Sequence, residues 1–132
     1  MKVKEYKIGT SKIKMQDRER EEKNGLSRGY KAVTIKDGKM IELVDLRLAV
    51  SASGTWYACI WCKGEEWNSG SGRASGYGYH KASAAAAYAI RAAGIILDED
   101  IDGRGWTAVE EAVKVIGEYL SGGEVFVVGM YA

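Results

Sequence analysis

A glycine-rich segment over residues 64–80 carries the side chains best suited to bind a ligand. Its 17 residues include five glycines, three serines and three aromatic residues, and it leads into the alanine-rich stretch Lys81–Ala93. This stretch predicts a helix that ends at Gly94 in a left-handed conformation. A helix start presents unpaired N–H groups and partial positive charge, and glycines let these donors approach a phosphate. The segment therefore predicts an anion-binding loop.

The predicted ligand-binding residues are of three chemical kinds. Cations would pair with phosphate, hydroxyl and imidazole groups would donate hydrogen bonds, and aromatic rings would stack on a base. The set is Trp67, Arg73, Ser75, Gly76, Tyr77, Gly78, Tyr79, His80, Lys81, Ser83 and Arg104. Arg104 belongs here, with Trp106, if the glycines beside them let their loop fold toward residues 70–80. His80 is the single histidine, and the spacing shows no Ser/His/Asp arrangement that would include it. No catalytic residue is therefore predicted.

Spacing excludes two well-known phosphate loops. A Walker loop needs Lys directly after its second glycine, but Tyr77 follows Gly76. The dinucleotide fingerprint G-x-G-x-x-G is also absent, since Gly70, Gly72 and Gly76 are two and four residues apart. Neither a P-loop motor nor a Rossmann dehydrogenase is predicted.

Three resemblances involve this segment. Arg73-x-x-Gly76-x-Gly78, between a strand and a helix, resembles the pyrophosphate loop of GNAT-type N-acetyltransferases. That likeness implies that Arg73, Gly76 and Gly78 hold acetyl-CoA. The stretch from Gly76 to Ala84 also resembles the end of a double-stranded-RNA-binding domain, although only Lys81 remains of that family's lysine cluster, so nucleic acid is not the expected partner.

A broader resemblance is to an uncharacterised family of small phage and mobile-element proteins. It rests on Gly76-Tyr-Gly-Tyr-His-Lys81 with Ser83-Ala-Ala, on Ala93-Gly-Ile95 and on Asp102-Gly-Arg-Gly105, and it covers residues 70–120 loosely. The likeness implies a viral setting in which a small protein sequesters a host signal or blocks a defence complex. It implies no reaction.

Two other patterns contain metal-ligand residue types. Asp98-x-Asp100-x-Asp102-Gly103 matches the first half of a calcium loop, but Val109 stands where the closing glutamate belongs. Cys59 and Cys62 spell C-x-x-C, yet on a regular strand this separation points the thiols to opposite faces. The sequence therefore predicts buried cysteines, an acidic loop, no metal site and no cofactor.

The elements around the segment predict an α+β fold in one domain, residues 1–132. A charged strand or arm over residues 1–29 precedes the core. Tyr30–Lys36 and Lys39–Val50 flank the hairpin turn Asp37-Gly38, and Thr55–Lys63 completes a meander that is apolar on both faces. Thr107-x-x-Glu110 predicts a capping box at the start of a second helix, and Val125–Met130 a final strand. We expect a mostly antiparallel sheet with two helices on one face.

Composition narrows the setting and the partners. The net charge of +1 hides a gradient, because residues 1–31 carry ten Lys and Arg against five Asp and Glu, whereas residues 98–132 carry two against eight. The sequence predicts no membrane span and no signal peptide, which favours the cytoplasm. Central strands that are apolar on both faces, with two helices to cover them, predict a homo-oligomer.

Three hypotheses of function follow from these patterns. The first is a non-enzymatic protein that binds a phosphate-bearing ligand, such as a nucleotide or signalling nucleotide, as a phage-type anti-defence protein. The second is a GNAT-like acetyl-CoA-dependent N-acetyltransferase. The third is an inhibitor that binds a host protein without a small ligand.

Overall fold

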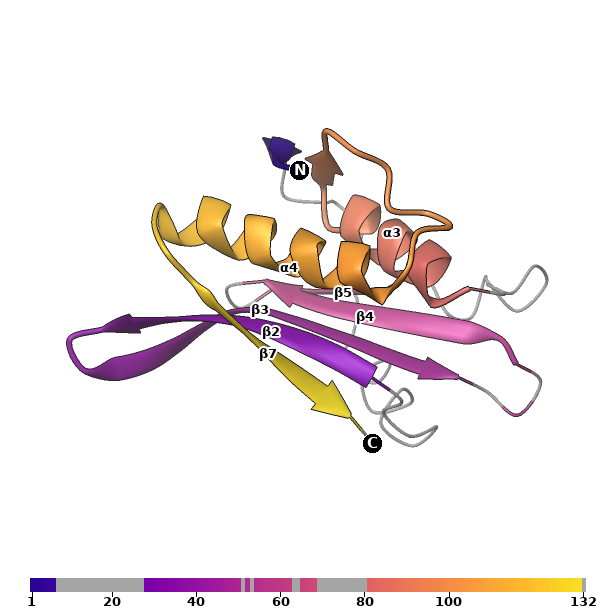
Figure 1. Ribbon diagram of the computed structural model, residues 1–132, viewed down its shortest axis with the longest axis horizontal. Coiled ribbons are helices and arrows are strands. Elements are labelled where there is room, and N and C mark those ends of the chain that lie inside the picture. The colour runs from indigo at the N-terminus through magenta and orange to yellow at the C-terminus, as the bar shows by residue number, and fades with distance from the viewer. Residues whose placement is uncertain (7–27, 51, 53, 63–64, 69–80, 132) are drawn as a thin grey trace.

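The computed structural model describes residues 1–6, 28–50, 52, 54–62, 65–68 and 81–131. Most of these described residues lie in strands and two helices (Figure 1). The strands are β1 (Val3–Tyr6), β2 (Arg28–Lys36), β3 (Lys39–Val50), β4 (Trp56–Cys62), β5 (Glu65–Asn68), β6 (Ile95–Leu97) and β7 (Phe126–Tyr131). The helices are α3 (Ala82–Ala92) and α4 (Trp106–Ser121).

The strands form an antiparallel sheet with both helices on one face, which confirms the predicted α+β fold (Figure 1). The strand order is β5-β4-β3-β2-β7, so the meander β2-β3-β4 is central and the C-terminal strand lies beside β2. β1 pairs with β6 in a separate two-stranded sheet. Glu65–Asn68 adds β5 to the edge of the main sheet, so the expectation that a loop begins at residue 64 is wrong for these four residues.

The β2–β3 hairpin is the clearest local match to the sequence. Asp37 and Gly38 both have positive φ, 54° and 74°, as a two-residue turn of this kind requires. Gly94 likewise follows α3 with a φ of 82°. A bulge between Ala32 and Val33 interrupts the pairing of β2 with β3 and adds local twist.

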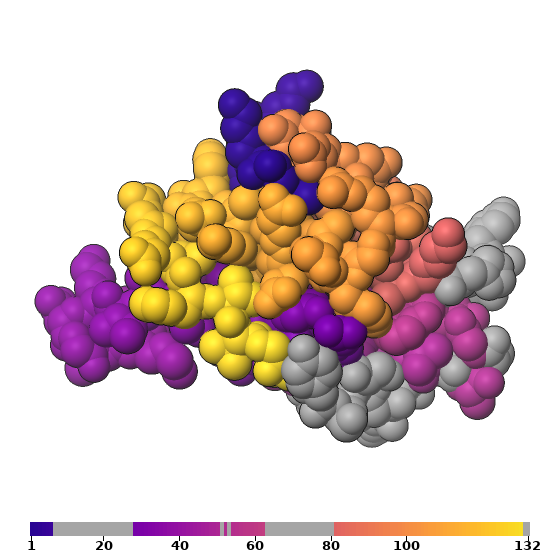
Figure 2. Space-filling view, viewed as in Figure 1, coloured from indigo at the N-terminus to yellow at the C-terminus, as the bar shows by residue number. Residues whose placement is uncertain are grey.

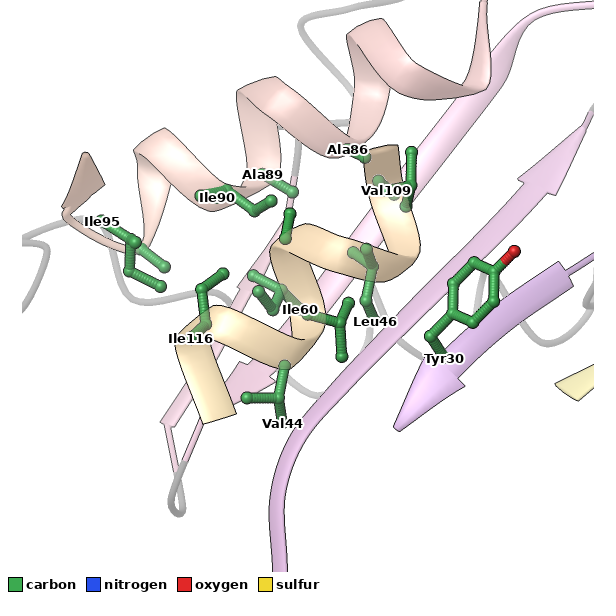
Figure 3. Close-up of a cluster of buried hydrophobic side chains, with 14 of the residues drawn as sticks. Tyr30, Val44, Leu46, Ile60, Ala86, Ala89, Ile90, Ile95, Val109 and Ile116 are labelled. Atoms are coloured by element: carbon green, nitrogen blue, oxygen red, sulfur yellow. The ribbon is translucent and has the colours of Figure 1, made fainter. Parts of the chain in front are cut away.

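The core lies between the sheet and the two helices (Figure 3). Side chains from the helix-facing side of the meander, among them Val44, Leu46 and Ile60, pack against both helices. Alanine supplies most of the buried side of α3, which lets that helix pack closely. Gly117 lets α4 pack closely on β2, because a Cβ atom at this position would lie 2.5 Å from the Cβ of Ala32.

One expectation about local structure is wrong. α4 begins two residues earlier than the predicted capping box requires: Gly105 is its N-cap, so no side-chain cap forms and Thr107 is exposed within the first turn. On the opposite face of β3, Asp45 is only 2% exposed, and its carboxylate lies 3.2 Å from the Nη2 atom of Arg47. Burial of this carboxylate is accompanied by an ion pair with its neighbour on the same strand face.

Candidate functional site

Both helices begin at the same end of the molecule (Figure 1). Lys81 is the N-cap of α3 and Gly105 is the N-cap of α4, each with an extended backbone and without a side-chain cap. The first strand residue of β4, Trp56, lies at this end as well. Two helix starts with positive partial charge therefore face one region of the surface.

A cleft of about 350 Å³ lies between the two helix starts. Its described lining is Trp56, Lys81, Ala82, Ser83, Gly103, Arg104, Gly105, Trp106 and Val109. Of these nine residues two are cationic and none is acidic, so the lining favours an anion. The volume falls within the range of small-molecule sites.

Two indole rings form one wall of the cleft. The rings of Trp56 and Trp106 meet edge to face, with 5.7 Å between their centroids. Behind Trp106, the guanidinium carbon of Arg28 lies 4.5 Å from the centroid of that ring and 5.6 Å from the centroid of Tyr30. This cation–π contact ties α4 to the first residue of β2 and holds the Trp106 ring in place.

The loop before α4 is tied to α3 by a buried hydroxyl. The backbone N–H of Gly103 donates to the Oγ atom of Ser83 over 3.1 Å, and Ser83 is only 5% exposed. In the same loop, Arg104 Nη1 lies 3.1 Å from Glu99 Oε2, with both side chains about half exposed. The Ser83 contact fixes the loop against α3, whereas the exposed ion pair is weak enough to exchange for a ligand.

The structure brings three of the predicted binding residues together: Lys81, Ser83 and Arg104. Trp67 lies on β5, and its side chain is outside the described part of the structure. Also outside the described residues are Arg73, Ser75, Gly76, Tyr77, Gly78, Tyr79 and His80.

Sequence reasoning missed Trp56 and Arg28 as neighbours of the cleft. Each is the first residue of its strand, and that position is the only sequence signal that could have suggested a role at the sheet end. Trp106 was considered together with Arg104, and both line the cleft.

The predicted acidic loop forms mainly local contacts. The Asp98 carboxylate accepts a hydrogen bond from the backbone N–H of Lys2, next to β1, over 2.7 Å. The Asp100 carboxylate accepts one from the backbone N–H of Asp102 over 3.0 Å. Within the described ranges, no group of three or more His, Cys, Asp or Glu side chains is placed to hold a metal ion.

The two cysteines are buried and not bonded to each other. Cys62 belongs to the core beneath the helices, whereas Cys59 is paired in register with Arg47 on the other face, as the spacing predicted. Burial raises the pKa of the Cys62 thiol from 9.0 to about 12, because the thiolate would lose its hydration. The neutral thiol acts here as a packing group rather than as a nucleophile.

A second pocket, of about 200 Å³, lies near the other end of α3. Its lining is mainly aliphatic, and its charged residues include Arg91, Glu99 and Asp100. The mixed charges and apolar walls make it less suited to phosphate than the cleft at the helix starts.

Comparisons of the chain with protein-family models, with curated proteins and with solved structures found no match. Neither described helix is long and apolar enough to cross a membrane. The chemistry of the cleft is therefore the basis on which a function can be assigned.

Proposed function

We propose that this protein binds a ligand that combines a phosphate group with an aromatic ring, as a nucleotide does, in the cleft between the starts of α3 and α4. The observation that carries this proposal is that two helix N-termini, two cationic side chains and two indole rings line one cleft. Each group suits a different part of such a ligand.

The phosphate is assigned to the side of the cleft where α3 begins. Lys81 is exposed there, and the carbonyl of Lys81 already accepts from the N–H groups of Ala84 and Ala85. The N–H groups of Ala82 and Ser83 belong to the first helical turn, where no intrahelical acceptor exists. Phosphate oxygens at this point would accept from these donors and pair with Lys81.

The aromatic ring of the ligand is assigned to the opposite wall. Trp56 and Trp106 are half-buried, so each presents part of its ring surface to the cleft. Stacking of a base on such a ring contributes about 1–3 kcal/mol and tolerates different bases. Arg104 lies between the two parts and would exchange its Glu99 partner for a phosphate oxygen.

Binding without catalysis suits this lining better than an enzymatic role. The described walls carry no imidazole, carboxylate or thiol, and the Ser83 hydroxyl is already held by Gly103. General acid–base chemistry needs a titratable group within hydrogen-bond reach of the substrate. His80, which precedes Lys81 in the chain, is the nearest such group in sequence and lies outside the described residues.

The proposed setting is the cytoplasm of an infected host, where a nucleotide-binding protein of phage type would sequester a signalling nucleotide. Its support is the likeness of residues 70–120 to small phage proteins and the presence of two buried cysteines that form no disulfide, which suit a reducing compartment. Acetyl-CoA binding and direct inhibition of a host protein are the competing outcomes of the test below.

The test is a titration of tryptophan fluorescence with nucleotides, cyclic nucleotides, inorganic phosphate and acetyl-CoA. We expect a nucleotide to bind, and Lys81→Ala to weaken it about tenfold or more, because a hydrogen bond to a charged group contributes about 1.5–3 kcal/mol. Arg91→Ala is the matched control, since Arg91 is an exposed cation in the last turn of the same helix.

Equal losses in the Lys81 and Arg91 variants would place binding elsewhere and contradict the proposal. Tight binding of acetyl-CoA alone, with acetyl transfer to an amine, would replace the proposal with the acetyltransferase hypothesis. Absence of binding by every phosphate compound would leave inhibition of a protein as the surviving hypothesis.

A further inference from the structure

β7 is an edge strand of the main sheet whose residues carry no charge. Among the described strands it pairs with β2 alone, and its sequence is Phe-Val-Val-Gly-Met-Tyr. Edge strands that avoid other chains usually carry lysine, proline or a bulge. The chain contains no proline, and the first charged residue before β7 is Glu124.

Apolar side chains of β7 are exposed beside this edge. Phe126 is 51% exposed and Val128 is 46% exposed, and both lie on the sheet face opposite the helices, because they pair with Val33 and Lys31. Figure 2 shows the C-terminal strand, in yellow, on the face toward the viewer. Exposed hydrophobic groups beside the edge of a sheet favour addition of another strand.

We propose that a second copy of this chain pairs with β7 in antiparallel orientation, with Val128 on the two-fold axis, so that the two sheets become continuous. In this register, apolar residues of β7 lie opposite apolar residues of the partner's β7. Phe126 then lies opposite the partner's Met130, and Val128 opposite the partner's Val128. Cross-strand apolar pairs of this kind stabilise antiparallel sheets.

The helix-facing side of β7 is complementary in the same register. Val127 lies opposite the partner's Gly129, so the branched valine side chain meets a residue that has no side chain. In a contact around a two-fold axis both copies contribute the same residues, so a charge near the axis would repel the same charge of the partner. β7 has none, which favours a second copy over a charged partner.

Charges on α4 complete the complementarity. A groove of about 280 Å³ runs along the β7 edge between Val127 and an exposed side of α4 that carries Glu110 and Lys114. The two-fold axis sets α4 antiparallel to its copy across this groove. Glu110 then faces the partner's Lys114, and Lys114 faces the partner's Glu110, so that opposite charges flank the shared strands.

The test is the mass of the protein in solution, measured by sedimentation over a range of concentrations. We expect a dimer for the wild type, and monomers for Val128→Lys and for Val128→Glu, each of which places two like charges at the axis. An equimolar mixture of the two variants should form a dimer again, because Lys then faces Glu. Recovery in the mixture also shows that both variants are folded.

The matched control is Ile96→Lys, which puts the same charge on β6, at a residue that is 45% exposed and outside the main sheet. This variant should remain dimeric. A monomeric wild type, a dimeric Val128→Lys variant or a mixture that stays monomeric would each overturn the proposal. The test does not depend on the nucleotide cleft, which lies within one chain at the helix starts.

Discussion

Replacement of Gly117 by alanine tests how closely α4 packs on the sheet. An added Cβ would lie 2.5 Å from Ala32 Cβ and 3.3 Å from Val125 Cγ2. Ordinary carbon contacts lie about 3.5–4.0 Å apart, so α4 would have to move outward by roughly 1 Å, and such a gap forfeits up to half of the dispersion energy of the contacts it opens.

The expected loss of stability follows from two opposing terms. Overpacking of a core costs about 1–3 kcal/mol. Alanine gains about 1 kcal/mol over glycine within a helix. We therefore expect Gly117→Ala to lower the free energy of unfolding by up to about 2 kcal/mol, whereas Thr107→Ala, at an exposed position of the same helix, should not lower it.

Chemical denaturation measures this difference, and a double-mutant cycle with Ala32→Gly locates its cause. The Ala32→Gly change restores space at the contact, so the double variant should lose less stability than the sum of the single losses. An increase of about 1 kcal/mol in Gly117→Ala would refute the reasoning, because helix propensity alone gives that sign.

Three further predictions concern the core and the loop beside the cleft. Between pH 9 and 12 the unfolded chain loses the Cys62 proton before the native protein does. Ionisation of Cys62 should therefore lower the free energy of unfolding by about 1.4 kcal/mol per pH unit. Equal slopes of stability against pH for the wild type and Cys62→Ala, measured by chemical denaturation, would contradict this. Ser83→Ala should cost about 1–2 kcal/mol on denaturation, since the Gly103 N–H loses its acceptor, and unchanged stability would show that the bond contributes nothing. Glu99→Gln should raise nucleotide affinity about two- to fivefold in a fluorescence titration, because the change releases Arg104 from a weak surface ion pair. Lower affinity would contradict this and would mean that Glu99 orients Arg104 for binding.

Local signals predicted most of the fold. The Asp37-Gly38 pair requires positive φ at two successive residues, and the alternation along residues 39–50 places one face of that strand in the core. Such features depend on residues that are close in sequence, so they can be predicted from the sequence alone. The β5 strand was missed because Glu65–Asn68 has no alternating pattern and gains its structure from pairing with β4.

The candidate site was predictable only in part, because its walls come from distant parts of the chain. Lys81 and Ser83 follow from the helix start and Arg104 from a glycine-flanked loop, and each of these is a local pattern. The contact between Trp56 and Trp106 joins residues that are fifty positions apart, and no spacing rule connects them. Sheet order and helix placement create that neighbourhood.

The most direct test of the proposed function is an NMR titration of the tryptophan indole N–H signals with a nucleotide, each signal assigned by a single Trp→Phe variant. We predict that the signals of Trp56 and Trp106 shift together and that the signal of Trp61 does not. Trp61 is on the same strand as Trp56, but the odd separation of the two residues places Trp61 on the opposite face of the sheet. Shifts of Trp61 without those of Trp56 and Trp106, or no shift in any of the three, would contradict a nucleotide site between the two helix starts.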